Sequence, residues 1–157
     1  MSRAAPLKPG HKAIQQYHAA LQQYLAQHVE HEGALETAFS RLLADTAPAR
    51  GWTLIPKLKY KVGGRTIFPD GTLRDEFNLP RGYWEAKDTH DDLDKEIQEK
   101  IKKGYPLSNI IFEDTRRAVL VQDGRERARF DLTNPQKVAD LLNDCYAYTE
   151  PNIEGFD

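Results

Sequence analysis

A glutamate and a lysine stand two residues apart in a short run of strand-forming residues, Tyr83-Trp84-Glu85-Ala86-Lys87. Side chains two positions apart on a strand point to the same face, so Glu85 and Lys87 lie about 7 Å apart along one side of it. A carboxylate and an ammonium side by side at a buried sheet edge are costly unless a metal ion or a substrate uses them. This pair is therefore the first candidate for a chemical site.

Two aspartates upstream of this strand are candidates to join the pair. Asp70 lies in a Pro-Asp-Gly tripeptide, and Asp75 follows it before a loop. If the loop is centred on Pro80, antiparallel pairing places Asp75 opposite Glu85. The turn at the glycine after Asp70 can also redirect that side chain toward the same site. Geometry favours Asp75, and the two aspartates can also act together.

Hydrophobic periodicity predicts the elements that position these residues. Apolar spacing of three or four residues predicts helices, and alternation or short apolar runs predict strands. We expect helices over 14–29, 35–43 and 88–104 and after Pro135, and strands over 52–62, 66–68, 72–77, 83–87, 109–112, 118–122 and 125–132. Asp88 or Thr89 is the expected N-cap of the third helix. The order of elements predicts an α/β or α+β domain with a central mixed sheet flanked by helices.

Composition predicts one folded domain. The chain has 157 residues, of which 39% are hydrophobic and 29% charged, and its single cysteine, Cys145, excludes an internal disulfide. We expect a flexible lead-in at 1–12, one domain at 13–150 and the start of a linker to a following domain at 151–157. No apolar stretch approaches the length of a membrane span, which favours a cytoplasmic protein without a membrane partner. The formal charge of -2 argues against binding nucleic acid by bulk positive charge but does not exclude a nuclease.

The pattern of Pro69-Asp70, a gap and Glu85-Ala86-Lys87 resembles the PD-(D/E)xK nuclease superfamily over about residues 33–122. The resemblance implies a restriction-endonuclease-like core in the order α-β-β-β-α-β. It implies that Asp70 and Glu85 hold Mg²⁺, for which Mn²⁺ can substitute, and that Lys87 orients or helps deprotonate the attacking water. The tripeptide resembles the aspartate motif of the phage-exonuclease and RecB-like branches, which favours Asp70 over Asp75.

The same resemblance implies secondary candidates. Glu36, on the helix before the sheet, is the candidate to reach the metal through water, and Gln98, on the helix after the sheet strand, is the candidate to lie near the scissile phosphate. Lys100, Lys102 and Lys103 are candidates for binding nucleic acid. A solvated helix end whose dipole favours cations explains these lysines about as well.

A longer run, residues 75–88 followed by Asp91-Asp92-Leu93, resembles the N-terminal nuclease segment of single-chain restriction-modification enzymes of the type ISP kind. This resemblance implies a metal-dependent endonuclease that cuts double-stranded DNA. It also implies ATPase, methyltransferase and target-recognition domains elsewhere in the same chain. The alternative is a catalytically silent nuclease-like module that binds DNA or a partner domain, and metal titration separates the two.

Overall fold

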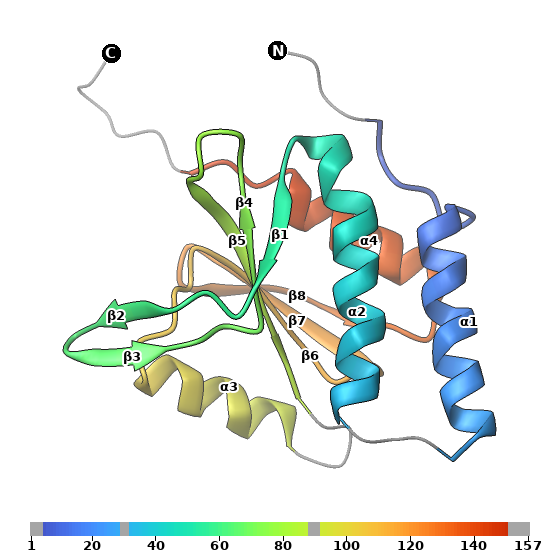
Figure 1. Cartoon of the computed structure of the whole chain (residues 1–157), viewed down its shortest axis with the longest axis horizontal. Helices are drawn as coiled ribbons and strands as arrows, with labels where there is room; N and C mark the ends of the chain where they lie inside the picture. Colours follow the sequence, from blue (N-terminus) through green and yellow to red (C-terminus); the bar gives the residue numbers. More distant parts are fainter. Residues whose placement is uncertain (1–4, 29–31, 88–91, 151–157) are drawn as a thin grey trace.

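The structure, a computed structural model, describes residues 5–28, 32–87 and 92–150 (Figure 1). Its helices are α1 (Lys12–Ala26), α2 (Glu32–Thr46), the short 3-10 helix η1 (Ala47–Arg50), α3 (Leu93–Lys102) and α4 (Pro135–Tyr146). Its strands are β1 (Thr53–Pro56), β2 (Tyr60–Val62), β3 (Arg65–Ile67), β4 (Gly71–Arg74), β5 (Pro80–Ala86), β6 (Asn109–Glu113), β7 (Arg117–Gln122) and β8 (Arg125–Asp131).

Six strands form one mixed sheet in the order β1-β4-β5-β6-β7-β8. The β5 and β6 strands are parallel and are connected through α3, while the other neighbours in this sheet are antiparallel. The β2 and β3 strands form a separate two-stranded hairpin. The α/β fold with a mixed central sheet that the sequence predicts is thus confirmed.

Helices cover both faces of the sheet (Figure 1). On one face, α1, α2 and α4 bury a core in which the rings of Phe39 and Trp84 stack at 5.5 Å. On the other face, Leu93 and Ile97 of α3 pack in a core that includes Tyr83. Because neighbouring strand residues alternate, Trp84 faces the first core while Tyr83 and Glu85 face α3. The α3 side of the sheet therefore carries the candidate glutamate.

The predicted strand over 52–62 is wrong, because the chain turns at Lys57. This residue has a φ of 55°, which is unusual for a side chain other than glycine, and it separates β1 from β2. Its backbone N–H donates to the carbonyl oxygen of Asp70 at 3.2 Å. The alternating lysines Lys57, Lys59 and Lys61 begin at the break, and their spacing made the two strands look like one in the sequence.

The predicted pairing of Asp75 with Glu85 is also wrong. Gly71 pairs with Trp84, and a register shift follows between Leu73 and Arg74. The Oδ1 atom of Asp75 accepts hydrogen bonds from the backbone N–H groups of Phe77 and Leu79. These bonds close a short turn that precedes Pro80, the residue on which the sequence suggested the loop is centred. The shorter turn moves the register so that Asp70 lies opposite Glu85.

The ends of the predicted domain are only partly described. The suggested N-caps Asp88 and Thr89 lie outside the described residues, as does the predicted linker at 151–157. The α3 helix begins after Asp92, whose side chain accepts hydrogen bonds from the N–H groups two and three residues on. Within the predicted lead-in, Leu7 exchanges two hydrogen bonds with the Asn143 side chain of α4. Among the described helices, none has both the length and the apolar character to cross a membrane.

Candidate active site

Asp70 and Glu85 meet where β4 begins and β5 ends. The backbone N–H of Asp70 donates to Glu85 Oε1 at 3.0 Å, and the N–H of Ala86 donates to Asp70 Oδ2 at 2.7 Å. Both residues are buried, with relative exposures of 8% and 6%. These hydrogen bonds hold the two carboxylates in fixed orientations, since each is tied to the backbone of the other's strand.

Glu36 and Lys57 extend this pair toward α2. The Lys57 ammonium contacts Asp70 Oδ1 and lies 2.9 Å from Glu36 Oε1. Glu36 faces the sheet from α2, and Lys57 lies in the turn between β1 and β2. The helix residue that the sequence suggests as a metal contact through water therefore belongs to the cluster, where the ammonium of Lys57 joins it to Asp70.

Two lysines, one on α3 and one directly after β5, lie on the other side of the cluster. Lys100 Nζ lies 2.8 Å from Glu85 Oε2 and 3.4 Å from Glu96 Oε1, and it sits over the Tyr105 ring at 4.8 Å. Lys87 Nζ lies 3.4 Å from Glu96 Oε2. The two ammonium groups are therefore linked through Glu96, and Lys100 lies inside the site, away from the exposed end of α3.

The electrostatics of the cluster follow from burial and from close opposite charges. Burial raises the pKa of Glu85 to about 7, the charge of Asp70 adds to this effect, and Lys100 opposes it. Burial also raises the pKa of Glu36, against the lowering effect of Lys57. Burial lowers the pKa of Lys57 and of Lys100, but their carboxylate partners outweigh it, so both pKa values lie above the ordinary value. Both lysines are fully charged at neutral pH.

The donor set fits a hard divalent cation. Asp70, Glu85 and Glu36 offer carboxylate oxygens, the ligands that Mg²⁺ prefers. A cationic group already stands between two of them, because the Lys57 ammonium contacts both Asp70 and Glu36. Within the described part of the chain, no three Asp, Glu, His or Cys side chains are grouped as a ready metal site. Binding of a metal ion by these carboxylates therefore requires the Lys57 ammonium to move away from Asp70 and Glu36.

The remaining sequence candidates lie outside the cluster. Asp75 is held in the β4–β5 turn, where its Oδ2 accepts a hydrogen bond from Arg81 Nε at 2.8 Å. Gln98 is exposed on α3, and Lys102 and Lys103 are exposed at its C-terminal end. The sequence reasoning missed Lys57 and Glu96. Lys57 belongs to a run of alternating lysines that look equivalent, and Glu96 becomes visible only as the residue four positions before Lys100 on one helix face.

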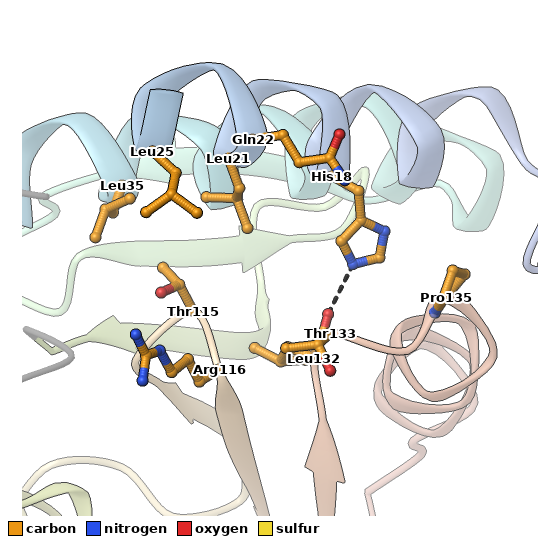
Figure 2. Close-up of a pocket in the computed structure, with 10 residues that line it drawn as sticks. All are labelled: His18, Leu21, Gln22, Leu25, Leu35, Thr115, Arg116, Leu132, Thr133 and Pro135. Atoms are coloured by element: carbon orange, nitrogen blue, oxygen red, sulfur yellow. Dashed lines mark hydrogen bonds between the residues drawn. The ribbon is translucent and has the colours of Figure 1, made fainter. Parts of the chain in front are cut away.

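A hollow of about 380 Å³ lies away from this cluster (Figure 2). Leu21 and Leu25 of α1 and Leu35 of α2 line it together with residues that follow β6 and β8. His18 points across it, with Nε2 2.7 Å from the carbonyl oxygen of Leu132. None of the acidic residues of the cluster lines it.

Comparison with solved structures supports the fold assignment. A chain in the cryoEM structure of a DrdV–DNA complex superposes with a TM-score of 0.86 and 41% sequence identity. The match covers 89% of this chain and 14% of the DrdV chain. The present chain therefore spans about a seventh of the length of the matched one. Together with the order of strands, this likeness identifies the fold as restriction-endonuclease-like.

A second solved structure, a candidate nuclease belonging to DUF820 from Anabaena variabilis, aligns with a TM-score of 0.46 and 13% identity. That alignment covers 64% of this chain and 66% of the other, and the likeness is too low to argue from. No protein-family model matches the sequence, and no curated protein matches it.

Proposed function

We propose that the chain is a Mg²⁺-dependent DNA endonuclease domain that hydrolyses phosphodiester bonds. The observation that carries the proposal is the pairing of Asp70 with Glu85 across β4 and β5, with Lys87 and Lys100 beside them. Buried carboxylates held this closely together are destabilising unless a cation balances them. Buried carboxylates with lysines beside them are expected where a protein binds a metal ion and a phosphate group together.

Asp70 and Glu85 are the proposed ligands, with Glu36 as a further contact. When bound, Mg²⁺ or Mn²⁺ supplies a polarised phosphate oxygen and a more acidic attacking water. The chain's own lysines do the remaining work in this proposal. Lys87 orients the attacking water, while Lys100 holds the Glu85 carboxylate in place through the 2.8 Å contact and keeps its charge balanced.

The proposed substrate is double-stranded DNA, and the proposed context is a larger chain. The matched structure is a DNA complex, and this chain spans only 14% of the matched chain. Both facts support a DNA-cutting domain of a larger chain. The finer proposal, a cytoplasmic restriction-modification enzyme of the type ISP kind, rests on the sequence resemblance of residues 75–88. The ATPase, methyltransferase and target-recognition functions would then reside in other domains of the same chain, since phosphodiester hydrolysis needs none of their substrates.

Plasmid nicking tests the proposal. Supercoiled plasmid is incubated with the wild type, Glu85→Ala and Lys87→Ala in Mg²⁺, Mn²⁺ or EDTA. We expect nicking by the wild type in either metal, none in EDTA, and loss of nicking in both variants although each retains its circular dichroism spectrum. Full activity in both variants would end the proposal.

The alternative is a silent nuclease-like module that binds DNA or a partner domain. The salt bridges of Lys57 and Lys100 favour it, because they already balance the carboxylates without a metal. Calorimetric titration with Mn²⁺ separates the two functions. Saturable binding that Glu85→Ala abolishes supports the enzyme, whereas no binding at millimolar Mn²⁺ supports the silent module.

A further inference from the structure

The β2–β3 hairpin extends away from the main sheet beside α3 (Figure 1). Its tip is Gly63-Gly64, and both glycines have positive φ values, 57° and 78°, as a tight hairpin turn requires. The chain enters the hairpin just after Lys57 and leaves it just before Asp70. Those two residues are joined by the ion pair and the backbone hydrogen bond of the candidate active site, so the hairpin is rooted in that site.

The hairpin segment carries only positive charges. Residues 57–69 include three lysines and one arginine and no aspartate or glutamate, although the whole chain has a formal charge of -2. Lys57 is used at the root, whereas Lys59, Lys61 and Arg65 are exposed. A segment with positive charges alone therefore adjoins the four carboxylates of the cluster, Glu36, Asp70, Glu85 and Glu96.

The hairpin is anchored at its base and packs on the end of α3. Tyr60 stacks edge-on against Tyr83 of β5 at 5.9 Å, and its hydroxyl donates to Thr72 Oγ1 at 3.1 Å. A Cβ atom at Gly104 would lie 2.9 Å from Val62 Cγ1, which shows how closely the hairpin approaches the end of α3. The exposed Lys102, the last residue of α3, and Lys103, its C-cap, come directly before this contact in the chain and so lie on the same side of the molecule as the hairpin.

We propose that the hairpin surface, defined as Lys59, Lys61, Arg65, Lys102 and Lys103, binds the phosphate backbone of duplex DNA. This inference rests on the proposed function, because the surface would hold the substrate of the same site. Lysine and arginine contacts to phosphates are the main source of sequence-independent affinity for DNA. A two-stranded ribbon also has the width that the major groove admits. The carboxylate cluster repels phosphate by itself, so a basic element rooted in it gives the DNA a favourable approach.

Fluorescence anisotropy with a labelled duplex oligonucleotide in EDTA tests this surface without cleavage. The test variant combines Lys59→Ala, Lys61→Ala and Arg65→Ala. The matched control combines Lys12→Ala, Arg41→Ala and Lys137→Ala, which removes the same charge from exposed positions on α1, α2 and α4, the helices of the opposite face. Thermal melting of both variants checks that each is folded, and all of the substituted side chains are exposed.

We expect the hairpin variant to bind at least about tenfold more weakly at 150 mM salt. Its slope of log affinity against log salt should be smaller than that of the wild type by about three. The control should lose less than about threefold. Three results would contradict the proposal that the hairpin surface binds DNA. They are an equal loss of affinity in the two variants, unchanged binding by the hairpin variant, and no binding by the wild type at 50 mM salt.

The same experiment is independent of catalysis. The Glu85→Ala variant should retain duplex binding although it does not nick plasmid. Binding that depends on the hairpin, without nicking by the wild type, would support the DNA-binding surface and contradict the proposed nuclease activity. Nicking that the hairpin substitutions leave unchanged would support the nuclease activity and contradict the DNA-binding surface.

Discussion

Two buried glutamates lie near the ends of the neighbouring parallel strands β5 and β6, and their partners differ in kind. Glu85 accepts hydrogen bonds from the Lys100 ammonium and from the backbone of Asp70. Glu113 accepts from Trp84 Nε1 at 2.9 Å and from the backbone N–H of Thr115 at 2.8 Å. One carboxylate is balanced by a charge, and the other is held by neutral donors.

Burial raises the pKa of both groups, to about 7 for Glu85 and about 8 for Glu113. Glu113 faces the core that includes Trp84, where its neutral partners satisfy it without any ion. The Lys57 side chain at the other site is 55% exposed, so its ammonium can exchange with solvent cations. Burial alone therefore does not mark a functional carboxylate. What distinguishes Glu85 is its charged partner Lys100 and its place in a cluster that also holds the exposed ammonium of Lys57.

The largest expected difference between the two glutamates is in cleavage. Glu85→Gln should lower plasmid nicking in Mg²⁺ by about a thousandfold or more, because the amide is a poor ligand for a hard cation. Glu113→Gln keeps a carbonyl oxygen for the Trp84 N–H and should nick at nearly the wild-type rate. Equal losses, measured per folded molecule, would show that the two glutamates do not differ in the way proposed.

The opposite contrast should appear in stability. Glu113→Ala leaves the indole N–H of Trp84 and the N–H of Thr115 without their acceptors and should lower the free energy of unfolding by about 4 kcal/mol. Urea unfolding at pH 7 in EDTA measures this loss. Glu85→Ala serves as the comparison and should cost less, because it leaves one backbone N–H, that of Asp70, without its acceptor while Lys100 keeps Glu96 at 3.4 Å. A similar loss in that variant would contradict the distinction.

A pH series sharpens the assignment of Glu85. Between its ordinary pKa of 4.5 and its folded value of about 7, the folded chain binds more protons at this group than the unfolded chain, so its contribution to stability falls as pH rises. Glu85→Gln has no such loss. In EDTA it should exceed the wild type in unfolding free energy by up to about 3 kcal/mol at pH 8.

That advantage should become small near pH 4.5 and vanish below it, where the wild-type Glu85 is protonated in both the folded and the unfolded state. Chemical unfolding at pH 4.5, 6 and 8 follows the difference. A difference that does not change with pH would mean that burial of the Glu85 charge is not its source.

Removing the competing ammonium should strengthen metal binding. Lys57→Gln frees the oxygens of Asp70 and Glu36 and should tighten Mn²⁺ binding by roughly tenfold in calorimetric titration, about 1.4 kcal/mol. Lys59→Gln removes one positive charge two residues away, on the exposed hairpin, and should leave the affinity nearly unchanged. Weaker binding by Lys57→Gln would mean that Lys57 supports the ligands and does not compete with the ion.

The smallest effect is expected at the second aspartate. Asp75→Asn should change plasmid nicking by less than about twofold, because its side chain closes the β4–β5 turn and bonds to Arg81, away from the cluster. Asp70→Asn is the matched comparison and should lose nicking. The reverse result would assign the role to the aspartate that the sequence geometry favoured.

Much of the fold could be predicted because its signals are local. The strand and helix periods identified the helices, the strands at the centre of the sheet and the turn at Asp123-Gly124, where both residues adopt positive φ. The errors occurred where a single residue changes the path of the chain. At Lys57 the backbone turns although the alternation of side-chain types continues through it. The short turn that Asp75 closes changes the register of β4 on β5, so that Asp70 and not Asp75 lies opposite Glu85.

For the candidate site, the sequence by itself determined that Glu85 and Lys87 share one face of a strand, because that follows from the two-residue period of any strand. Only the tertiary structure decided which aspartate meets Glu85, since this depends on the turn length and the register shift. It also decided that Lys57 and Lys100 balance the carboxylates. Those contacts join a turn and a helix to distant strands, and local spacing carries no information about which of several similar lysines will reach a buried charge.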